Sequence, residues 1–139
     1  MPIDIRDATA EDEHQVLALW RACGLVAPHN DPVSDFRFAI GGPASTVLVA
    51  HADDLIVASA MVGHDGHRGW LYYVACAPER RGEGLGSSIV VAGEAWLRVQ
   101  GVVKVQLMVR EANATVVPFY EQLGYEDMPR VLMSKWLST

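Results

Sequence analysis

The residues best suited to carry chemistry lie between positions 79 and 88, where the chain reads ERRGEGLGSS. Two arginines are followed by three glycines at alternate positions, just before a helical pattern begins. The N-terminus of a helix exposes unpaired N–H groups and the positive end of the helix dipole, so it binds anions. Glycines let the backbone turn sharply and let a phosphate approach without meeting a Cβ atom. The stretch therefore predicts a loop that binds phosphate or pyrophosphate through backbone N–H groups.

Two familiar phosphate-binding loops do not fit this stretch. A Walker A loop needs a lysine before its Ser or Thr, and here Ser87 and Ser88 follow the glycines with no lysine. A Rossmann loop needs the spacing G-x-G-x-x-G in the first strand–helix–strand unit. Gly82, Gly84 and Gly86 have a different spacing and lie in mid-chain. A glycine-rich turn that only connects a strand to a helix is the structural alternative.

The elements that must position the loop follow the order β-α-α-β-β-β-α-β-α-β, which predicts one α/β domain over residues 1–139 with a mixed sheet. Thr9 with Asp12 three residues later is an acidic variant of the capping box, and Asp31 before Pro32 is a second helix start. The alternation of apolar residues predicts six strands, and apolar residues at helical spacing predict four helices. The strands are expected at 3–6, 46–51, 55–62, 70–76, 102–109 and 131–136, and the helices after Thr9, after Asp31, at 85–100 and at 115–123.

Composition narrows the class of partner. The chain has 11 Lys and Arg against 17 Asp and Glu, a net charge of −6, which argues against nucleic-acid binding and favours cationic or neutral partners. Cys23 and Cys76 lie far apart, and neither they nor the five histidines have metal-ligand spacing, so no metal is expected. The acidic N-terminus carries no apolar secretory segment and no run reaches the ~20 apolar residues of a membrane helix. A cytoplasmic location without membrane contact is therefore expected.

A second motif follows about thirty residues after the glycines, where Asn113 precedes Tyr120 by seven positions in NATVVPFYEQLGYE. The run from Arg81 to Gly86 fits the pattern R/Q-x-x-G-x-G/A. With these two motifs the chain resembles the GCN5-related N-acetyltransferases, the GNAT superfamily. GLVAPHNDP at 24–32 and GHDGHRGWLYYV at 63–74 are similar to small bacterial YpeA-type members. The resemblance implies a GNAT-like fold with a mixed, mostly antiparallel central sheet and flanking helices.

The resemblance also implies acetyl-CoA as co-substrate, lying between two splayed parallel strands at 70–76 and 102–109. The pantetheine arm would pair with the first of these strands and the pyrophosphate would lie on the glycine loop. Asn113 would help to shape the pantetheine site, although a plain helix N-cap is an equal alternative for it. The implied cofactor-binding residues are Val74, Ala75, Cys76, Arg81, Gly82, Gly84, Gly86, Ser87, Asn113 and Tyr120.

By the same resemblance, the amine acceptor attacks the thioester directly in a ternary complex. A backbone N–H near Val74 or Ala75 would stabilise the oxyanion. Tyr120 would protonate the departing CoA thiolate as general acid, the alternative being a core tyrosine on an amphipathic helix.

The general base is less clearly marked. Some relatives carry a glutamate in the strand before the second motif, but Met108 stands at that place here and cannot accept a proton. His67 is the expected base, because the unperturbed pKa of histidine is about 6.5, and a solvated turn histidine is the alternative. Other base candidates are Asp65, Tyr72 and Tyr73. The acceptor is expected to contact Trp20, Asn30, Asp35 and Tyr72.

Three functions compete on this sequence. The first is an acetyl-CoA-dependent N-acetyltransferase whose amine acceptor is a polyamine, an amino acid, an antibiotic or a peptide N-terminus. The second is a non-catalytic acyl-CoA-binding regulatory module, which Tyr120 argues against. The third is an enzyme of nucleotide phosphates. Exposed apolar positions and edge strands permit a homodimer.

Overall fold

The structure, a computed structural model, describes residues 3–138, and the chain divides into two compact units at the bond between Met108 and Val109. The first unit contains the sheet and three long helices, and the second contains two short helices and the C-terminal segment. The prediction of a single domain over residues 1–139 stays a prediction.

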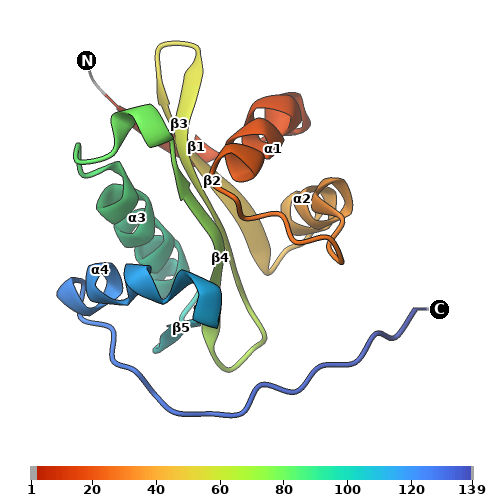
Figure 1. Ribbon diagram of the computed structural model, residues 1–139. Coiled ribbons are helices and arrows are strands. Elements are labelled where there is room, and N and C mark those ends of the chain that lie inside the picture. The colour runs from red at the N-terminus through yellow and green to blue at the C-terminus, as the bar shows by residue number, and fades with distance from the viewer. Residues whose placement is uncertain (1–2, 139) are drawn as a thin grey trace. The chain divides into compact units, whose positions relative to one another are not determined.

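A five-stranded sheet organises the first unit (Figure 1). Its order is β1-β2-β3-β4-β5, with antiparallel pairing from β1 to β4 and parallel pairing of β5 with β4. The helices α1 and α2 lie on one face of this sheet and α3 lies on the other. The strands are β1 (Asp4–Asp7), β2 (Ser45–Ala52), β3 (Leu55–His64), β4 (Gly69–Cys76) and β5 (Val105–Leu107), and the helices are α1 (Glu13–Ala22), α2 (Pro32–Gly41) and α3 (Leu85–Val99).

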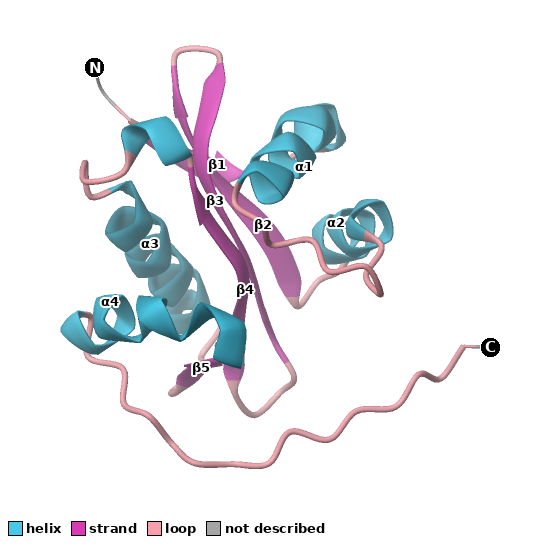
Figure 2. Cartoon of the chain, viewed as in Figure 1, coloured by secondary structure: helices cyan, strands magenta, loops and turns pink. Residues whose placement is uncertain are grey.

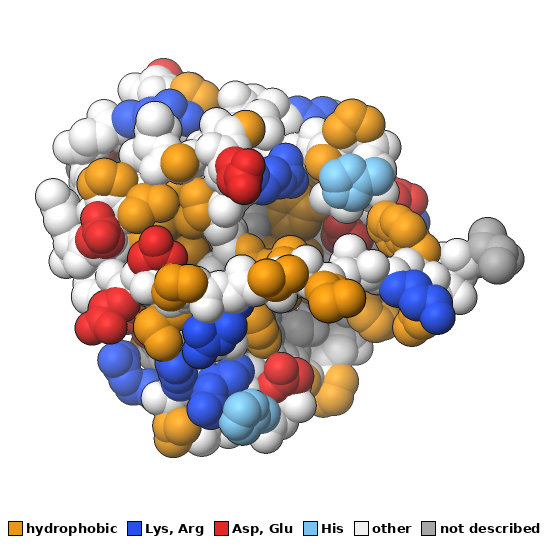
Figure 3. All heavy atoms as spheres, turned by 60° about the horizontal axis from the view of Figure 1, so that its bottom comes forward, with side chains coloured by type: hydrophobic (Ala, Val, Ile, Leu, Met, Phe, Trp, Pro, Cys, Tyr) orange, Lys and Arg blue, Asp and Glu red, His pale blue; other side chains and the backbone are white. Residues whose placement is uncertain are grey.

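Helices on both faces explain why β2 and β3 read as nearly continuous apolar runs instead of alternating ones. Both faces of these strands are buried, and the buried side chains of α1, α2 and α3 complete the core. The fully buried side chains include Val47, Val49, Val57 and Val62 from the strands and Trp20, Phe36, Ile89 and Leu97 from the helices. Hydrophobic side chains also share the surface with charged ones (Figure 3).

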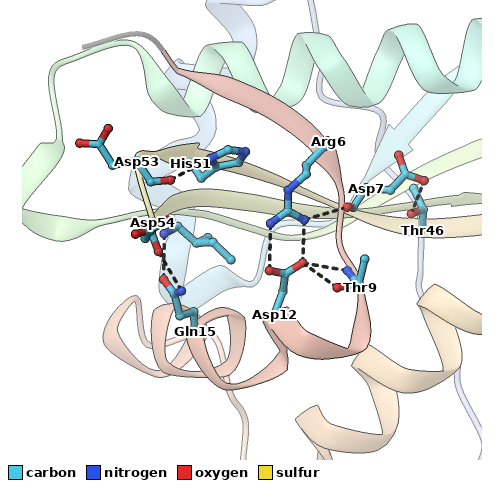
Figure 4. Close-up of polar contacts among 10 residues, drawn as sticks. Arg6, Asp7, Thr9, Asp12, Gln15, Thr46, His51, Asp53 and Asp54 are labelled. Atoms are coloured by element: carbon cyan, nitrogen blue, oxygen red, sulfur yellow. Dashed lines mark hydrogen bonds and ion pairs between the residues drawn. The ribbon is translucent and has the colours of Figure 1, made fainter.

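The predicted starts of α1 and α2 are confirmed. Arg6 holds Asp12 with two hydrogen bonds of 2.7 and 3.0 Å, and the Thr9 N–H donates to the same carboxylate at 2.8 Å (Figure 4). This capping box opens a short 3₁₀ turn, Ala10–Asp12, that leads into α1. The hydrogen bond from Arg6 lowers the pKa of Asp12 to about 2. Asp31 caps α2 by accepting from the N–H groups of residues 33 and 34.

The second unit contains a 3₁₀ segment, Glu111–Val116, followed by α4 (Val117–Gln122). The strand predicted at 131–136 is wrong, since the described chain has no strand after α4 and is drawn there as loop (Figure 2). A strand needs a ladder partner and a face that is buried. Here Val131 and Met133 are each 87% exposed and pair with no strand. The strand predicted at 102–109 is confirmed only in its middle, as β5.

Candidate functional site

The loop between β4 and α3 has the backbone that an anion site requires. Gly82 and Gly84 have φ angles of 88° and 80°, a left-handed conformation that side-chain-bearing residues rarely adopt. A Cβ built at either position would meet no atom within 4 Å. The glycines are therefore needed for the turn itself, and the space beside them is open to a ligand.

The first turn of α3 is uncapped. The first hydrogen bond of the helix joins the Ser88 N–H to the Gly84 carbonyl at 3.0 Å, so the N–H groups of residues 85–87 have no partner within the helix. Gly84 offers no capping side chain, and the first turn carries no acidic residue. A 15-residue helix thus points bare N–H groups and the positive end of its dipole at the open space.

The two arginines of the loop differ in their partners. Arg80 forms an ion pair with Glu83 at 2.9 Å, and this contact lowers the pKa of Glu83. Arg81 is exposed and belongs to none of the ion pairs formed by residues 3–138. Arg81 therefore supplies unpaired positive charge beside the loop, whereas Glu83 offsets the charge of Arg80.

The parallel pair β4 and β5 separates after three residues. β5 pairs with Gly69, Trp70 and Leu71 only, so from Tyr72 to Cys76 the strand β4 is paired on its β3 side alone. The predicted splay between these strands is therefore present within the first unit. It leaves the backbone of β4 with an open edge in the segment that contains Val74, Ala75 and Cys76.

A β-bulge lies on this open segment. Ser59 faces Ala75 and Met61 faces Tyr72, so Ala60 alone stands opposite two residues of β4. Tyr73, one of these two, has a φ of 50°, which costs a side-chain-bearing residue of order 1–3 kcal/mol. Sequence reasoning missed this bulge, because it had no glycine to mark it.

Two contacts of Tyr73, and one contact of its neighbour Trp20, hold Tyr73 in place. Its ring is stacked on Trp20, with ring centroids 4.0 Å apart and planes 7° apart. Its hydroxyl donates to Asp35 Oδ2 at 2.7 Å. Trp20 is itself anchored by a hydrogen bond of 3.0 Å from Nε1 to Ser59 Oγ. The bulge is thus supported by side chains from α1, α2 and β3.

The predicted acceptor residues lie in different settings. Trp20 is fully buried, so its side chain offers no exposed surface to an acceptor and packs on Tyr73 instead. Asp35 and Asn30 are half-buried, and the Asn30 N–H donates to the Ala27 carbonyl at 3.0 Å. Tyr72 is 41% exposed. The partial burial of its phenol, and to a lesser extent the negative charge of Asp65, raise the pKa of that phenol.

His67 and Asp65 both belong to the turn between β3 and β4. Asp65 Oδ1 accepts the N–H groups of His67 and Arg68 at 2.9 and 2.8 Å, and Oδ2 accepts Trp70 Nε1 at 3.3 Å. These hydrogen bonds lower the pKa of Asp65, which makes it a poor base and a good turn former. The His67 side chain is exposed.

The second cysteine lies at the end of the open segment. The Cys23 thiol donates to the Cys76 carbonyl at 3.2 Å, so the structure brings together two cysteines that are distant in sequence. Burial raises the pKa of the Cys76 thiol, so it stays protonated at neutral pH. Cys76 can contribute its backbone to a site, but its thiol has little nucleophilic character.

In the second unit, Tyr120 packs edge-on against Phe119 and Tyr125, with ring centroids 4.9 and 5.8 Å away. Burial raises the pKa of its phenol. Asn113 is not a helix N-cap, because Arg110 occupies the N-cap position of the 3₁₀ segment and Val116 that of α4. Asn113 instead breaks the 3₁₀ segment with non-helical backbone angles (φ −116°, ψ 23°).

Residues 3–138 offer neither a metal-binding group of side chains nor a membrane-spanning helix. No group of three or more His, Cys, Asp or Glu side chains in this part of the chain could hold a metal ion. No helix in the same range is long and apolar enough to span a bilayer.

Comparison with known proteins gives a consistent result. The family model described as "Acetyltransferase (GNAT) family" matches residues 9–125. An acetyltransferase of Yersinia pestis is 36% identical over 135 residues, which cover 97% of this chain and 96% of the relative.

Two solved structures share the fold at low sequence identity. One is the aminoglycoside acetyltransferase AAC(6')-Iy in complex with a bisubstrate analogue, with a TM-score of 0.83, 17% identity, and coverage of 99% of this chain and 100% of that one. The other is a predicted acetyltransferase of Clostridium acetobutylicum with acetyl-CoA, with a TM-score of 0.79, 15% identity, and coverage of 96% of both chains.

Proposed function

This chain belongs to the GNAT family of acetyltransferases, and on that premise we propose that it transfers the acetyl group of acetyl-CoA to an amine in a ternary complex. The observation that carries the proposal is the uncapped first turn of α3 beside the left-handed Gly82 and Gly84. Bare N–H groups, open space and one unpaired arginine together suit a pyrophosphate.

The residues of the first unit fit the rest of acetyl-CoA as well. The open edge of β4 from Tyr72 to Cys76 offers N–H and C=O groups to the amide-bearing pantetheine arm, which would add to the sheet like a short strand. The pyrophosphate would accept from the N–H groups of Gly82, Gly84, Gly86 and Ser87, with Arg81 beside them. CoA bound to the solved acetyltransferase AAC(6')-Iy is in keeping with this assignment.

Acetyl transfer needs an oxyanion donor, and the bulge supports one. Because Ala60 faces two residues of β4, the bulge disrupts regular pairing at Tyr73 and Val74. We assign an N–H near Val74 or Ala75 to the thioester oxygen, where charge develops in the transition state. Such a donor contributes ~10²–10³ in rate.

Proton transfer is assigned to two side chains. Tyr120 donates a proton to the leaving CoA thiolate, and its raised pKa keeps the phenol protonated at neutral pH. His67 accepts the proton of the amine through water, since Asp65 has a lowered pKa and Met108 cannot take up a proton. For Asn113 we propose a contact with the pantetheine end of acetyl-CoA.

A single experiment tests the assignment against its rivals. The purified chain is titrated with acetyl-CoA by calorimetry, and CoA thiol release is then followed with a panel of amines. An acetyltransferase binds acetyl-CoA and releases thiol only when an amine is present. Binding without release for every amine would favour the regulatory module, and ATP binding that CoA fails to displace would favour the nucleotide enzyme.

A further inference from the structure

Tyr73 and Asp35 form a supported pair that the proposed chemistry leaves without a role. The Tyr73 hydroxyl donates to Asp35 Oδ2 at 2.7 Å, on the face of the sheet covered by α1 and α2. The ring is stacked on Trp20, whose Nε1 donates to Ser59 Oγ. Trp20 and Ser59 are both fully buried. The position of the phenol, and with it the position of the carboxylate, is therefore set by the core.

Asp35 carries a charge that residues 3–138 leave without a cation. None of the ion pairs described in this range includes it, and its side chain accepts one hydrogen bond, from Tyr73. Arg37, two residues further along α2, is paired instead with Glu13 at 2.7 Å. A half-buried carboxylate without a cation loses hydration and gains no ion pair in return. A positively charged ligand group would supply the missing interaction.

The place of Asp35 relative to the reaction indicates which group it binds. Under the proposed function the acetyl carbonyl lies at the backbone near Val74, beside the bulge. Asp35 accepts a hydrogen bond from the hydroxyl of Tyr73, which lies at the opposite end of that side chain from the backbone of β4. The attacking nitrogen has to come within about 3–3.5 Å of the carbonyl carbon. We therefore assign to Asp35 a group other than the attacking nitrogen.

We propose that Asp35, held in place by Tyr73, binds a second cationic group of the acceptor, so that the enzyme selects diamines and diamino sugars over monoamines. This inference rests on the proposed function. The net charge of −6 favours the approach of such dications.

The test compares matched acceptors. Linear α,ω-diamines of increasing length and diamino sugars are each paired with the analogue in which one amino group is replaced by hydroxyl. The wild-type kcat/KM is expected to be about tenfold or more higher for the better dications than for their hydroxyl analogues. Asp35→Asn should bring this ratio close to one, mainly through the KM of the dication, while acetyl-CoA binding measured by calorimetry stays within about twofold of wild type.

Two further variants separate recognition from general effects. Asp54→Asn changes the net charge by the same amount at an exposed position in the turn between β2 and β3, and should keep the preference. Tyr73→Phe keeps the aromatic ring but removes the hydroxyl that holds Asp35, and should lower the preference partly. It also replaces Asp35→Asn as the decisive variant if that protein does not fold, as judged by circular dichroism.

The outcomes are distinguishable. If wild type acetylates amines but treats dications and hydroxyl analogues alike, or if the variant at Asp35 keeps the preference, the inference is overturned and the proposed function stands. If wild type binds acetyl-CoA yet releases no thiol with any amine, the proposed function fails and the inference falls with it.

Discussion

Gly84, at the N-terminus of α3, combines a left-handed backbone with open space where a side chain would project. Gly84→Glu places a negative charge in that space, next to the bare N–H groups of the first helical turn. We expect the affinity for acetyl-CoA to fall by about 100-fold or more, because the carboxylate competes with the pyrophosphate for the same donors. Calorimetric titration measures the change.

The chain offers a matched control at the other end of the same helix. Gly101 has a φ of 86°, and a Cβ there also meets no atom within 4 Å. Gly101→Glu therefore introduces the same backbone strain and the same charge, away from the loop. It should lower stability by a similar amount and leave acetyl-CoA affinity nearly unchanged. Equal losses of affinity in both variants would remove the pyrophosphate from the loop.

A substitution at Tyr120 tests the proposal that this side chain is the general acid. Tyr120→Phe removes the phenolic proton and keeps the ring that packs against Phe119 and Tyr125. We expect kcat to fall by ~10²-fold or more, with acetyl-CoA affinity and thermal stability close to wild type. Stopped-flow or steady-state thiol release gives kcat, and calorimetry gives the affinity. Wild-type turnover in this variant would show that the thiolate leaves without help from Tyr120.

At the scale of the element, the loop before α3 contains its own counter-charge. Glu83→Gln breaks the ion pair with Arg80 and frees the guanidinium for a bound phosphate. Because the pair is solvent-exposed and therefore weak, acetyl-CoA affinity should rise by only about two- to fivefold at low salt and less at high salt. Glu79→Gln, an equal change of charge in the same loop, is the control. An identical gain from both variants would mean that only net charge matters.

The packing of α3 on β4 depends on a glycine in the strand. A Cβ at Gly69 would lie 2.6 Å from Leu97 Cδ1, and Leu97 is only 2% exposed and cannot move aside. Gly69→Ala should lower the free energy of unfolding by about 1–3 kcal/mol through overpacking. Gly41→Ala, at a site where a Cβ meets nothing within 4 Å, is the control and should not destabilise. Urea unfolding of both variants checks this, and equal stabilities would contradict the close packing.

Local signals in the sequence predicted most of these elements. Thr9 with Asp12 and Asp31 with Pro32 fix helix starts through their own hydrogen bonds, so their positions could be read from residue type. The segment 131–136 has strand-forming residues but no ladder partner in the described chain, and pairing is a long-range property. The last strand was predicted wrongly for that reason.

The site was predictable to the extent that glycine marks it. Gly82 and Gly84 adopt left-handed angles that their residue type permits, and the loop was predicted from them. Tyr73 adopts a similar angle without glycine, because Trp20 and Asp35 hold its side chain from two other elements. Contacts between residues 38 and 53 positions apart leave no local pattern in the sequence. The support of the bulge could therefore be seen only in the structure.

At the scale of the whole molecule, the acidic side chains behind the net charge of −6 differ in whether they have a cationic partner. Glu13, Asp12 and Glu83 each have an arginine nitrogen within 3 Å. Asp35 accepts only a hydrogen bond from the hydroxyl of Tyr73. Asp35 is one of several carboxylates of residues 3–138 that have no ion pair, and its half-buried position and its hydrogen bond from Tyr73 single it out as the one proposed to bind a ligand. The homodimer that the sequence permits stays a prediction, which sedimentation at several concentrations would test.

The pair of Arg6 and Asp12 links β1 to the start of α1, so it should make the stability of the whole chain depend on pH. The folded pKa of Asp12, about 2, lies below the value of about 3.9 for an unfolded aspartate. The unfolded state therefore binds a proton first as the pH falls. The contribution of Asp12 is complete above about pH 5 and is lost as the pH falls through 4 toward 2.

We expect this contribution to be of the order of 1 kcal/mol, because solvent screens the exposed side of Arg6. Asp12→Asn should lower the free energy of unfolding by about that amount at pH 7, and the difference from wild type should shrink to nearly zero at pH 2. Urea unfolding across this pH range measures both curves. Asp54→Asn, which removes an exposed carboxylate without an ion pair, should give a curve parallel to wild type. A constant gap between wild type and Asp12→Asn at every pH would mean that Asp12 acts through packing, because only a charge-dependent contact disappears when the carboxylate is protonated.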